Sequence, residues 1–456
     1  MKPRERRDSG QGDLLRSRLD QIIDMRHPLV ALAHKVDWAF IENTFGEAYK
    51  DGPGQPPLPT RLMAGLTILK YTHDLSDEVL CERWVENPYY QFFCGEEFFQ
   101  HELVLDRSSL TRWRQRMGEE KIKALLQESL SIAVKTDAVK PSELSEVIID
   151  TTVEPKNVMF PTDARLLNRA REILVRLAKK HGVKLRQSYA RMGKFALIKH
   201  QRYAHAKQFK RANRALKTLR TYLGRVIRDI ARKIENDGWL KEVVFKGILS
   251  RARRVRDQKQ HQRGPKVYSL HAPEVECIGK GKAHRPYEFG VKVSVATTHR
   301  HAKGGQFAIH AKALPGNPYD GHTLQSTMDR IVATSGVEPE HAYVDMGYRG
   351  HDYEGECQIH VGRRRRGSIT KSLWRWMKRR AAIEPSIGHL KEHRRMERCR
   401  LKGTEGDKVN AVLSAAGMNF SKLLTLLGAL CSFLLERFVA LFASRSPRET
   451  IAATAG

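Results

Sequence analysis

Apolar residues recur at intervals of three and four positions through the N-terminal part of the chain, which is the spacing of amphipathic helices. The stretch DGPGQPPLP, residues 51–59, interrupts this pattern and predicts a turn or linker. Residues suited to capping stand where the following helices should begin, at Thr60, at Ser76 and near Asp106. The pattern predicts an all-helical domain over residues 25–140, after a flexible basic arm over residues 1–24.

The last of these expected helices carries a tryptophan among arginines, in the segment DRSSLTRWRQRMG. Arg112 and Arg114 flank Trp113, and short capped helices with a basic, aromatic last member are compatible with a helix-turn-helix reader of DNA. They are equally compatible with ordinary helix packing. The sequence leaves both interpretations open.

Beyond residue 140 the pattern changes to short apolar and β-branched runs interleaved with helical segments, which predicts an α/β fold with a mixed sheet flanked by helices. Strands are expected at 146–150, 151–160, 266–278, 287–298, 307–314, 340–345 and 358–361. A helix is expected over 323–334, and an apolar helix over 409–443. Charged residues near its end and its basic context favour a packing helix over a membrane span.

Residues 163–263 form a block of unusual charge within this region. They contain 30 Lys and Arg against seven Asp and Glu, so they carry a net +23 of the whole chain's +30. Apolar residues at helical spacing predict two or three long basic helices here. An apolar seam along them is typical of a coiled-coil dimer, while the outer face suits phosphate binding, and the two interpretations are compatible.

The net charge of +30 makes nucleic acid the leading partner, because such a charge repels itself unless a polyanion neutralises it. A solubilising surface or binding to a membrane surface are the alternatives. The six cysteines contain no CxxC pair, so neither a zinc knuckle nor a disulfide framework is indicated. The opening residues are charged rather than apolar, so we expect no signal peptide and a cytoplasmic protein.

Three carboxylates are candidates for catalysis. Asp150 and Asp345 stand at the ends of expected strands, and Glu384 is isolated in the basic segment WRWMKRRAAIEPSIGHLK. Arg380, Glu384 and Lys391 lie four and then seven residues apart, which would place them on one face of a continuous helix. Pro385 should start or kink that helix.

Oxygen donors of this kind suit Mg²⁺ or Mn²⁺ rather than zinc. Two such ions about 3.5–4 Å apart can activate a water or a 3′-hydroxyl and stabilise the oxygen that leaves phosphorus. A single aspartate at a strand end is more often a turn or cap residue. The combination with a strongly basic chain is what favours the catalytic interpretation.

These motifs resemble the DDE transposases of bacterial insertion sequences, most closely the insertion sequence five family. The resemblance rests on VIIDTT, YVDMGYRG and RAAIEPSIGHLK, and it extends over roughly residues 25–425. That family's signature is Tyr, two residues, Arg, three residues, Glu, six residues, Lys. Arg380, Glu384 and Lys391 fit it, whereas Met377 occupies the tyrosine position, where Trp374 or Trp376 could stack on DNA instead.

The resemblance implies a ribonuclease-H-like catalytic domain over residues 141–425, interrupted by the basic insertion 163–263 and followed by a C-terminal helix and tail over 426–456. It implies that Asp150, Asp345 and Glu384 bind the metal ions, two of them in the family's pattern of two-metal phosphoryl transfer. Arg380 and Lys391 would contact phosphates near the cleaved end, and we add Arg349, which follows Asp345 closely, as a third candidate.

The implied function is that of a transposase that cleaves the ends of an insertion sequence and joins them to target DNA. Its partners would be double-stranded DNA, as terminal inverted repeats and as target, and a second copy of the chain, with no membrane and with location at the nucleoid. A nuclease of the same fold without strand transfer, and an inactive DNA-binding relative, are the alternatives.

Overall fold

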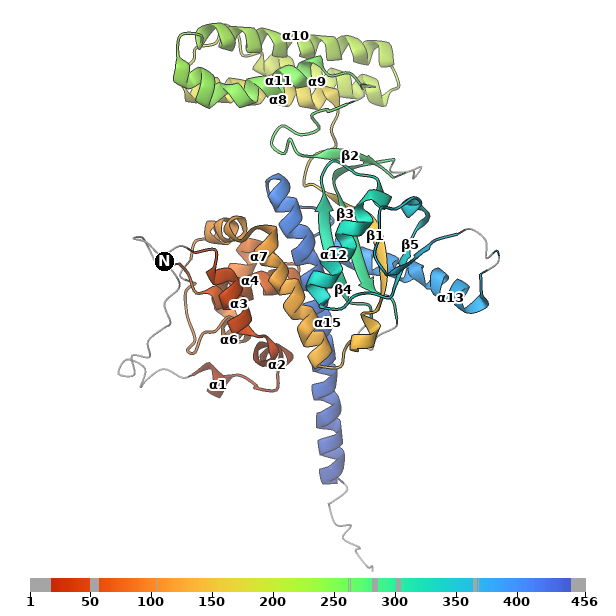
Figure 1. Cartoon of the computed structure of the whole chain (residues 1–456). Helices are drawn as coiled ribbons and strands as arrows, with labels where there is room; N and C mark the ends of the chain where they lie inside the picture. The colour runs from red at the N-terminus through yellow and green to blue at the C-terminus, as the bar shows by residue number, and fades with distance from the viewer. Residues whose placement is uncertain are drawn as a thin grey trace, which may run out of the picture. The chain divides into compact units, whose positions relative to one another are not determined.

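The computed structural model describes residues 18–49, 57–103, 105–260, 262, 264–280, 286–300, 305–363, 367 and 369–443. The chain divides into two compact units (Figure 1). One contains the described residues of Met1–Glu154 and Lys292–Gly456, and the other is Pro155–Val291.

The N-terminal region is helical, as predicted. Ser76 caps one helix by accepting the Val79 N–H at 3.1 Å, and Asp106 caps another by accepting the Ser108 N–H at 2.8 Å. Thr60 is the first helical residue rather than the cap. The helices are α1 (Leu19–Ile22), α2 (Pro28–Lys35), α3 (Trp38–Gly46), α4 (Thr60–Thr72), α5 (Asp77–Glu86), α6 (Pro88–Phe93) and α7 (Arg107–Lys135).

Helix α7 is broken at Gly118, whose φ of 62° lies in the left-handed region that L side chains rarely adopt. This break divides α7 into two helical parts, one on either side of residue 118. A short 3₁₀ turn, η1 (Pro141–Glu143), then leads into the sheet.

The sheet is mixed and has the order β2-β3-β1-β5-β6, with β4 also paired to β3. Strand β3 is antiparallel to β2 and β4, whereas β5 is parallel to both β1 and β6. The strands are β1 (Glu146–Pro155), β2 (Glu276–Gly279), β3 (Tyr287–Thr298), β4 (Ala308–Leu314), β5 (His341–Val344) and β6 (Gln358–Val361).

Two of the strand predictions need correction. The pieces predicted at 146–150 and 151–160 meet in one strand, β1, because the β-branched residues after Asp150 continue the extended backbone, and this strand ends at Pro155 rather than at residue 160. Of the strand predicted over 266–278, only the end forms β2. Pro273 has no N–H to donate to a strand ladder, and the residues before it fold into a turn in which the Ala272 N–H donates to Ser269 Oγ.

The C-terminal helix, α15 (Gly403–Ala443), packs against β4, α7 and α4 (Figure 1). Among the described residues it is the one helix long and apolar enough to span a membrane, but 67% of its most apolar window is buried inside the protein. Its Asn419 side chain both accepts from the Ala308 N–H at 2.9 Å and donates to the Ala308 carbonyl at 2.8 Å. Packing against the sheet therefore accounts for the apolar character of α15.

The remaining helices of this unit follow β4 and β6. Helix α12 (Leu324–Ser335) packs against β4. The others are the 3₁₀ turns η3 (Asp320–Thr323), η4 (Met346–Tyr348) and η5 (Arg380–Ala382), and the helices α13 (Lys371–Arg379) and α14 (Ile383–His393).

The described residues of the unit Pro155–Val291 form four α-helices rather than the two or three that the pattern predicts. They are α8 (Asp163–Lys180), α9 (Ala190–His205), α10 (Phe209–Lys233) and α11 (Lys246–Asp257), with the π-helical segment η2 (Leu240–Phe245) before α11. The turn between α9 and α10 contains neither glycine nor proline, so no residue typical of turns marks it in the sequence.

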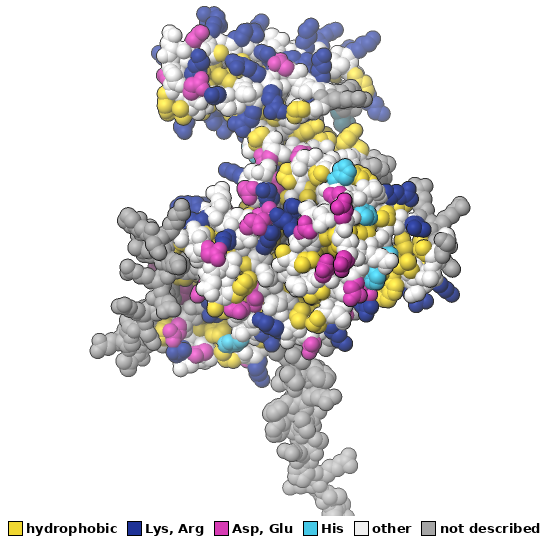
Figure 2. Space-filling view, in the orientation of Figure 1, with side chains coloured by type: hydrophobic (Ala, Val, Ile, Leu, Met, Phe, Trp, Pro, Cys, Tyr) yellow, Lys and Arg dark blue, Asp and Glu magenta, His cyan; other side chains and the backbone are white. Residues whose placement is uncertain are grey.

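These four helices share one hydrophobic core. Leu174, Leu223, Ile230 and Phe245 are fully buried in it. The apolar seam that would be available for a coiled-coil dimer is therefore buried within a single chain, and the basic side chains cover the outside (Figure 2).

Candidate active site

Strands β1 and β5 bring two of the predicted catalytic carboxylates together. Their parallel register pairs Val147 with Ala342 and Ile148 with Tyr343. Continued by two residues, this register places Asp150 opposite Asp345, and cross-strand neighbours point to the same face of a sheet. Asp345 directly follows β5, as predicted, whereas Asp150 lies inside β1 rather than at its end.

The Asp150 carboxylate is mostly buried and makes two hydrogen bonds. The Thr151 N–H donates to its Oδ1 at 2.7 Å, and Arg380 Nη1 donates to its Oδ2 at 3.0 Å. Burial raises the pKa of Asp150, and the charge of Asp345 raises it further, while the Thr151 and Arg380 contacts oppose the rise. The two aspartates therefore interact electrostatically, and Arg380 partly compensates their charge.

The turn after Asp345 is shaped around its carboxylate. Asp345 Oδ1 accepts the Gly347 N–H at 2.8 Å. A Cβ at Gly347 would come within 2.9 Å of Asp345 Oδ1 and 3.2 Å of Asp320 Oδ2, so only glycine allows this approach. Burial and the charges of Asp320, Asp150 and Asp345 raise the pKa of the neighbouring Tyr348 well above its usual range. The charges of Asp150, Asp320 and Asp345 thus all act on the Tyr348 side chain.

Asp320 is a carboxylate beside this site that the sequence analysis did not single out. It makes no capping bond to η3. Instead Lys292 Nζ donates to Asp320 Oδ1 at 3.1 Å and to the Pro318 carbonyl at 2.8 Å. Asp320 lies in GNPYDGHTL, a segment that shares the resemblance, but nothing in the local pattern distinguishes a site carboxylate from a cap.

Arg380 and Glu384 sit where the helical path is interrupted. Arg380 begins the 3₁₀ turn η5, and Pro385 stands in the first turn of α14, where its missing N–H breaks no helical hydrogen bond. This agrees with the predicted start or kink. Glu384 is exposed and makes no hydrogen bond or ion pair with another described residue.

The structure therefore joins Asp150, Asp345 and Arg380 but does not join Glu384 to them. Three carboxylates repel one another unless a cation lies among them, which is a physical reason for Glu384 to stay apart in the protein alone. Glu384 remains within one helical turn of Arg380, the residue that reaches Asp150.

A buried histidine fastens α13, the helix before Arg380, to the sheet. His299 Nδ1 lies 3.0 Å from Glu146 Oε2, and its Nε2 lies 3.1 Å from the Trp376 carbonyl. The Arg379 Nε–H donates to the His299 carbonyl at 2.8 Å, and the His299 ring stacks on Tyr343. Because Glu146 and Tyr343 belong to β1 and β5, these contacts fix the helix that leads to Arg380.

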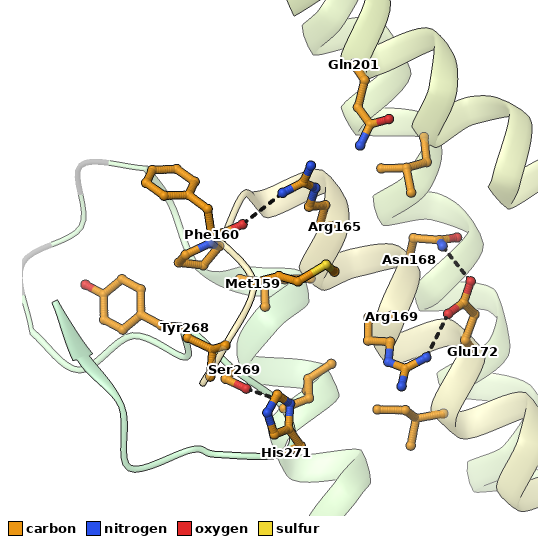
Figure 3. A pocket seen from close by; sticks show the side chains of 16 residues that line it. Met159, Phe160, Arg165, Asn168, Arg169, Glu172, Gln201, Tyr268, Ser269 and His271 are labelled. Atoms are coloured by element: carbon orange, nitrogen blue, oxygen red, sulfur yellow. Dashed lines mark hydrogen bonds and ion pairs between the residues drawn. The ribbon is translucent and has the colours of Figure 1, made fainter. Parts of the chain in front are cut away.

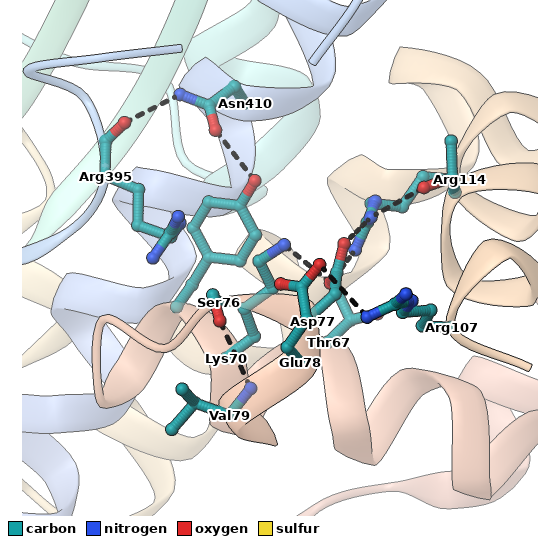
Figure 4. A network of polar contacts seen from close by, with 12 residues as sticks. Thr67, Lys70, Ser76, Asp77, Glu78, Val79, Arg107, Arg114, Arg395 and Asn410 are labelled. Atoms are coloured by element: carbon teal, nitrogen blue, oxygen red, sulfur yellow. Dashed lines mark hydrogen bonds and ion pairs between the residues drawn. The ribbon is translucent and has the colours of Figure 1, made fainter. Parts of the chain in front are cut away.

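The predicted DNA-binding residues are placed very differently from one another. Arg112 is exposed on α7 and Arg349 is exposed after η4, while Lys391 is half-buried on α14. Arg114 is only 3% exposed, and its guanidinium donates to both carboxylate oxygens of Asp77, at 3.0 and 2.6 Å (Figure 4). The prediction that Arg114 contacts DNA is therefore corrected: it stabilises the packing of α5 on α7.

Another group of potential ligands lies away from this site. The side chains of Glu154, Cys399 and Asp407 are buried, with ligand atoms within 4.8 Å of one another. Asn410 donates to Glu154 and accepts from the Tyr71 hydroxyl at 2.7 Å. None of the predicted catalytic carboxylates belongs to this group. Cysteines 81, 94, 277, 357 and 399 are all free thiols.

A cavity of about 700 Å³ opens in the unit Pro155–Val291 (Figure 3). Met159, Phe160 and Tyr268 line one part of it, and Arg165 Nη1 donates to the Phe160 carbonyl at 3.3 Å. No predicted catalytic residue lines it.

Comparison with known proteins identifies the family. Residues 17–116 match the family described as Transposase domain (DUF772), and residues 254–420 match the Transposase DDE domain. The chain belongs to the DDE transposases. A curated protein from Rhizobium meliloti, "Uncharacterized protein ORF8 in nfe locus", is 52% identical over 209 residues, which are 46% of this chain and 100% of that protein. No solved structure matches.

Membership in the DDE transposases confirms the predicted family and the ribonuclease-H-like fold, and the mixed sheet agrees with it. The narrower placement in the insertion sequence five family stays a prediction. The matched DDE segment contains Asp345, Glu384, Arg380 and Lys391, whereas Asp150 lies outside both matched segments. The position of Asp150 in the site rests on the register of β1 and β5.

Proposed function

We propose that this DDE transposase binds the ends of an insertion sequence, cleaves DNA there and joins the 3′ ends to target DNA. The observation that carries the proposal is the placement of Asp150 opposite Asp345 on parallel strands, with Arg380 bound to Asp150. The net charge of +30 suits a polyanionic substrate. The site of action would be the bacterial cytoplasm, at the nucleoid, with the chain acting as a homodimer on DNA.

The side chains at the site fit a divalent cation that prefers oxygen ligands. Burial, and to a smaller extent the charge of Asp345, raise the pKa of Asp150, so a cation beside the two carboxylates would stabilise their charged forms. We propose that Asp150, Asp345 and Glu384 hold Mg²⁺ or Mn²⁺, as two ions. Bound there, the metal would activate the attacking hydroxyl and neutralise charge that develops at phosphorus.

The protein's own groups have distinct roles in this proposal. Cleavage forms a bond from a water oxygen to phosphorus and breaks the bond from phosphorus to the 3′ oxygen, which leaves as a hydroxyl. Joining repeats the exchange, with that 3′-hydroxyl as the attacking group on a target phosphate. Arg380, Lys391 and Arg349 would hold phosphates near these reacting atoms, and Arg112 would contact DNA from α7.

Strand transfer is what separates this function from that of a nuclease with the same fold. The test combines the protein with a DNA fragment that carries the element's ends, with Mg²⁺ and with a plasmid target. We expect covalent joining of the fragment to the plasmid. Cleavage without joining would establish the nuclease, and binding without either reaction would establish an inactive DNA-binding relative.

Asp320 and Lys292 should matter for catalysis although neither belongs to the predicted triad. Asp320 contacts the turn that presents Asp345, so Asp320→Asn is expected to slow cleavage by on the order of 10–100-fold and to raise the Mg²⁺ concentration needed for half-maximal rate. Single-turnover cleavage at several Mg²⁺ concentrations measures both. Asp329→Asn on α12 is the control, and an unchanged Mg²⁺ requirement in Asp320→Asn would contradict the role.

A further inference from the structure

A groove on the helical unit Pro155–Val291 is lined by basic side chains and hydrogen-bond donors. It runs beside α10, is closed on one side by Arg256 of α11, and has a volume of about 650 Å³. Its polar lining residues are Asn213, Lys217, Arg220, Thr221, Arg228 and Arg256. We propose that this groove binds the phosphate backbone of double-stranded DNA, as a contact surface separate from the catalytic carboxylates.

The spacing of the lining residues makes the groove a continuous stripe. Positions 213, 217, 221, 224 and 228 follow one another at intervals of four and three, so they share one face of α10. At 1.5 Å per residue the stripe is about 22 Å long. A surface of that length can follow several successive phosphates of a duplex.

Three of the four basic residues that line this groove, Lys217, Arg220 and Arg228, have no carboxylate partner among the described residues, whereas Arg256 pairs with Asp257. Nearby carboxylates are already engaged: Asp229 with Arg232 and Lys233, and Asp257 with Arg256. The Arg220 Nε–H is also buried without an acceptor among the described residues, which is unfavourable in the protein alone.

Gly224 gives the groove its depth. A glycine in the middle of a 25-residue helix destabilises that helix relative to alanine, so its presence needs a reason. A Cβ there would be 3.5 Å from Arg228 Nη1 and from Arg256 Cδ, which is ordinary contact. The missing side chain therefore leaves room between these arginines for an incoming group.

The chemistry of the groove favours DNA over a protein partner. Interfaces between proteins have an apolar, aromatic-rich centre, whereas Leu216 is the one apolar side chain among the lining residues. The apolar seam of these helices is buried in the core that they form together. Contacts to backbone phosphates carry no sequence information, so the groove would strengthen binding to any duplex. This inference rests on the proposed function, since it takes DNA as the substrate.

The test compares two triple variants of the full chain that lose the same charge. The groove variant is Lys217→Gln, Arg220→Gln and Arg228→Gln, and the control is Lys194→Gln, Lys199→Gln and Arg202→Gln, all exposed on α9. Fluorescence anisotropy on a duplex without element ends gives the Kd over a series of salt concentrations. We expect the groove variant to bind about tenfold or more weakly, with a salt slope lower by about 2–3, and the control to change much less.

A steric variant tests the groove without changing charge. Gly224→Leu should fill the space between the arginines and weaken DNA binding several-fold, whereas Gly224→Ala should bind like the wild type, because its Cβ makes only ordinary contacts. Thermal unfolding of both variants confirms that α10 is intact.

Several results would overturn the inference. Two of them are an equal loss of DNA affinity in the two triple variants and an unchanged Kd in the groove variant. The others are tighter binding of RNA than of DNA by the groove, and a loss of DNA affinity that accompanies a change in oligomeric state. Failure of the groove is distinguishable from failure of the proposed function, because the latter is read from cleavage and joining. If groove variants bind normally while the wild type joins DNA, only the groove is wrong.

Discussion

Replacing Asp150, Asp345 or Glu384 with alanine is expected to abolish DNA cleavage while DNA binding survives. Each change removes a carboxylate proposed to hold the metal ions, and lost stabilisation of charge at phosphorus should slow the reaction by on the order of a thousandfold or more. DNA binding depends mainly on basic side chains elsewhere on the chain, so its Kd should stay near that of the wild type. Cleavage of a labelled element end and anisotropy on the same fragment measure the two properties.

Glu384 provides the sharpest form of this prediction, because it is exposed and makes no hydrogen bond or ion pair with another described residue. Glu392 is exposed on the same helix, so Glu392→Ala is a matched control that should cleave normally. Cleavage at the wild-type rate in Glu384→Ala would remove it from the proposed metal set. In that outcome Asp320, which already lies beside Asp345, becomes the third carboxylate to test.

The elements that the sequence predicted well are those whose signal is local. Strands β3 and β6 have the predicted bounds because apolar and β-branched residues recur at alternate positions along them, and the caps at Ser76 and Asp106 depend on residues two or three positions away. Asp345 was found for the same reason, since a strand, a carboxylate and a glycine-bearing turn follow one another directly.

The predictions that failed depend on partners far away in the chain. Arg114 resembles a DNA-binding arginine in its own segment, and only Asp77, 37 positions earlier, makes it a buried structural residue. Asp320 resembles a cap until Lys292, 28 positions earlier, is placed against it. Pairing of this kind leaves no trace in a local hydrophobic pattern, so the sequence could locate the strands that carry Asp150 and lead to Asp345 but not the polar network around them.

Replacing Asp77 should strongly destabilise the N-terminal helices. Asp77 accepts hydrogen bonds from the buried Arg114 at 2.6 Å and from the buried Lys70 at 2.7 Å (Figure 4). Without the carboxylate, two buried cations would face each other without a counter-charge, which costs about 3–5 kcal/mol. We expect Asp77→Asn to lower Tm by roughly 10 °C, measured by thermal unfolding followed by circular dichroism.

The same carboxylate should make the wild type sensitive to acid. Burial alone would raise the pKa of Asp77, but the hydrogen bonds and charges of Arg114 and Lys70 lower it from 3.8 to about 2. A lowered pKa in the folded state stabilises the protein above about pH 4, and this contribution, about 2 kcal/mol, is lost as the pH falls toward 2. Urea unfolding across this range should show the loss in the wild type and a smaller one in Asp77→Asn.

The neighbouring ion pair between Arg107 and Glu78 is the control for both measurements. Its partners are 66% and 54% exposed and 3.8 Å apart, so water screens their attraction and Glu78→Ala should cost under about 1 kcal/mol. If Asp77→Asn and Glu78→Ala destabilise the protein equally, the buried network does not stabilise these helices, and the reason for assigning Arg114 a structural role instead of a DNA contact is lost. A large cost for Asp77 alone means that Arg114 is held inside the domain, so of the two arginines that flank Trp113 only the exposed Arg112 is left for the proposed DNA contact.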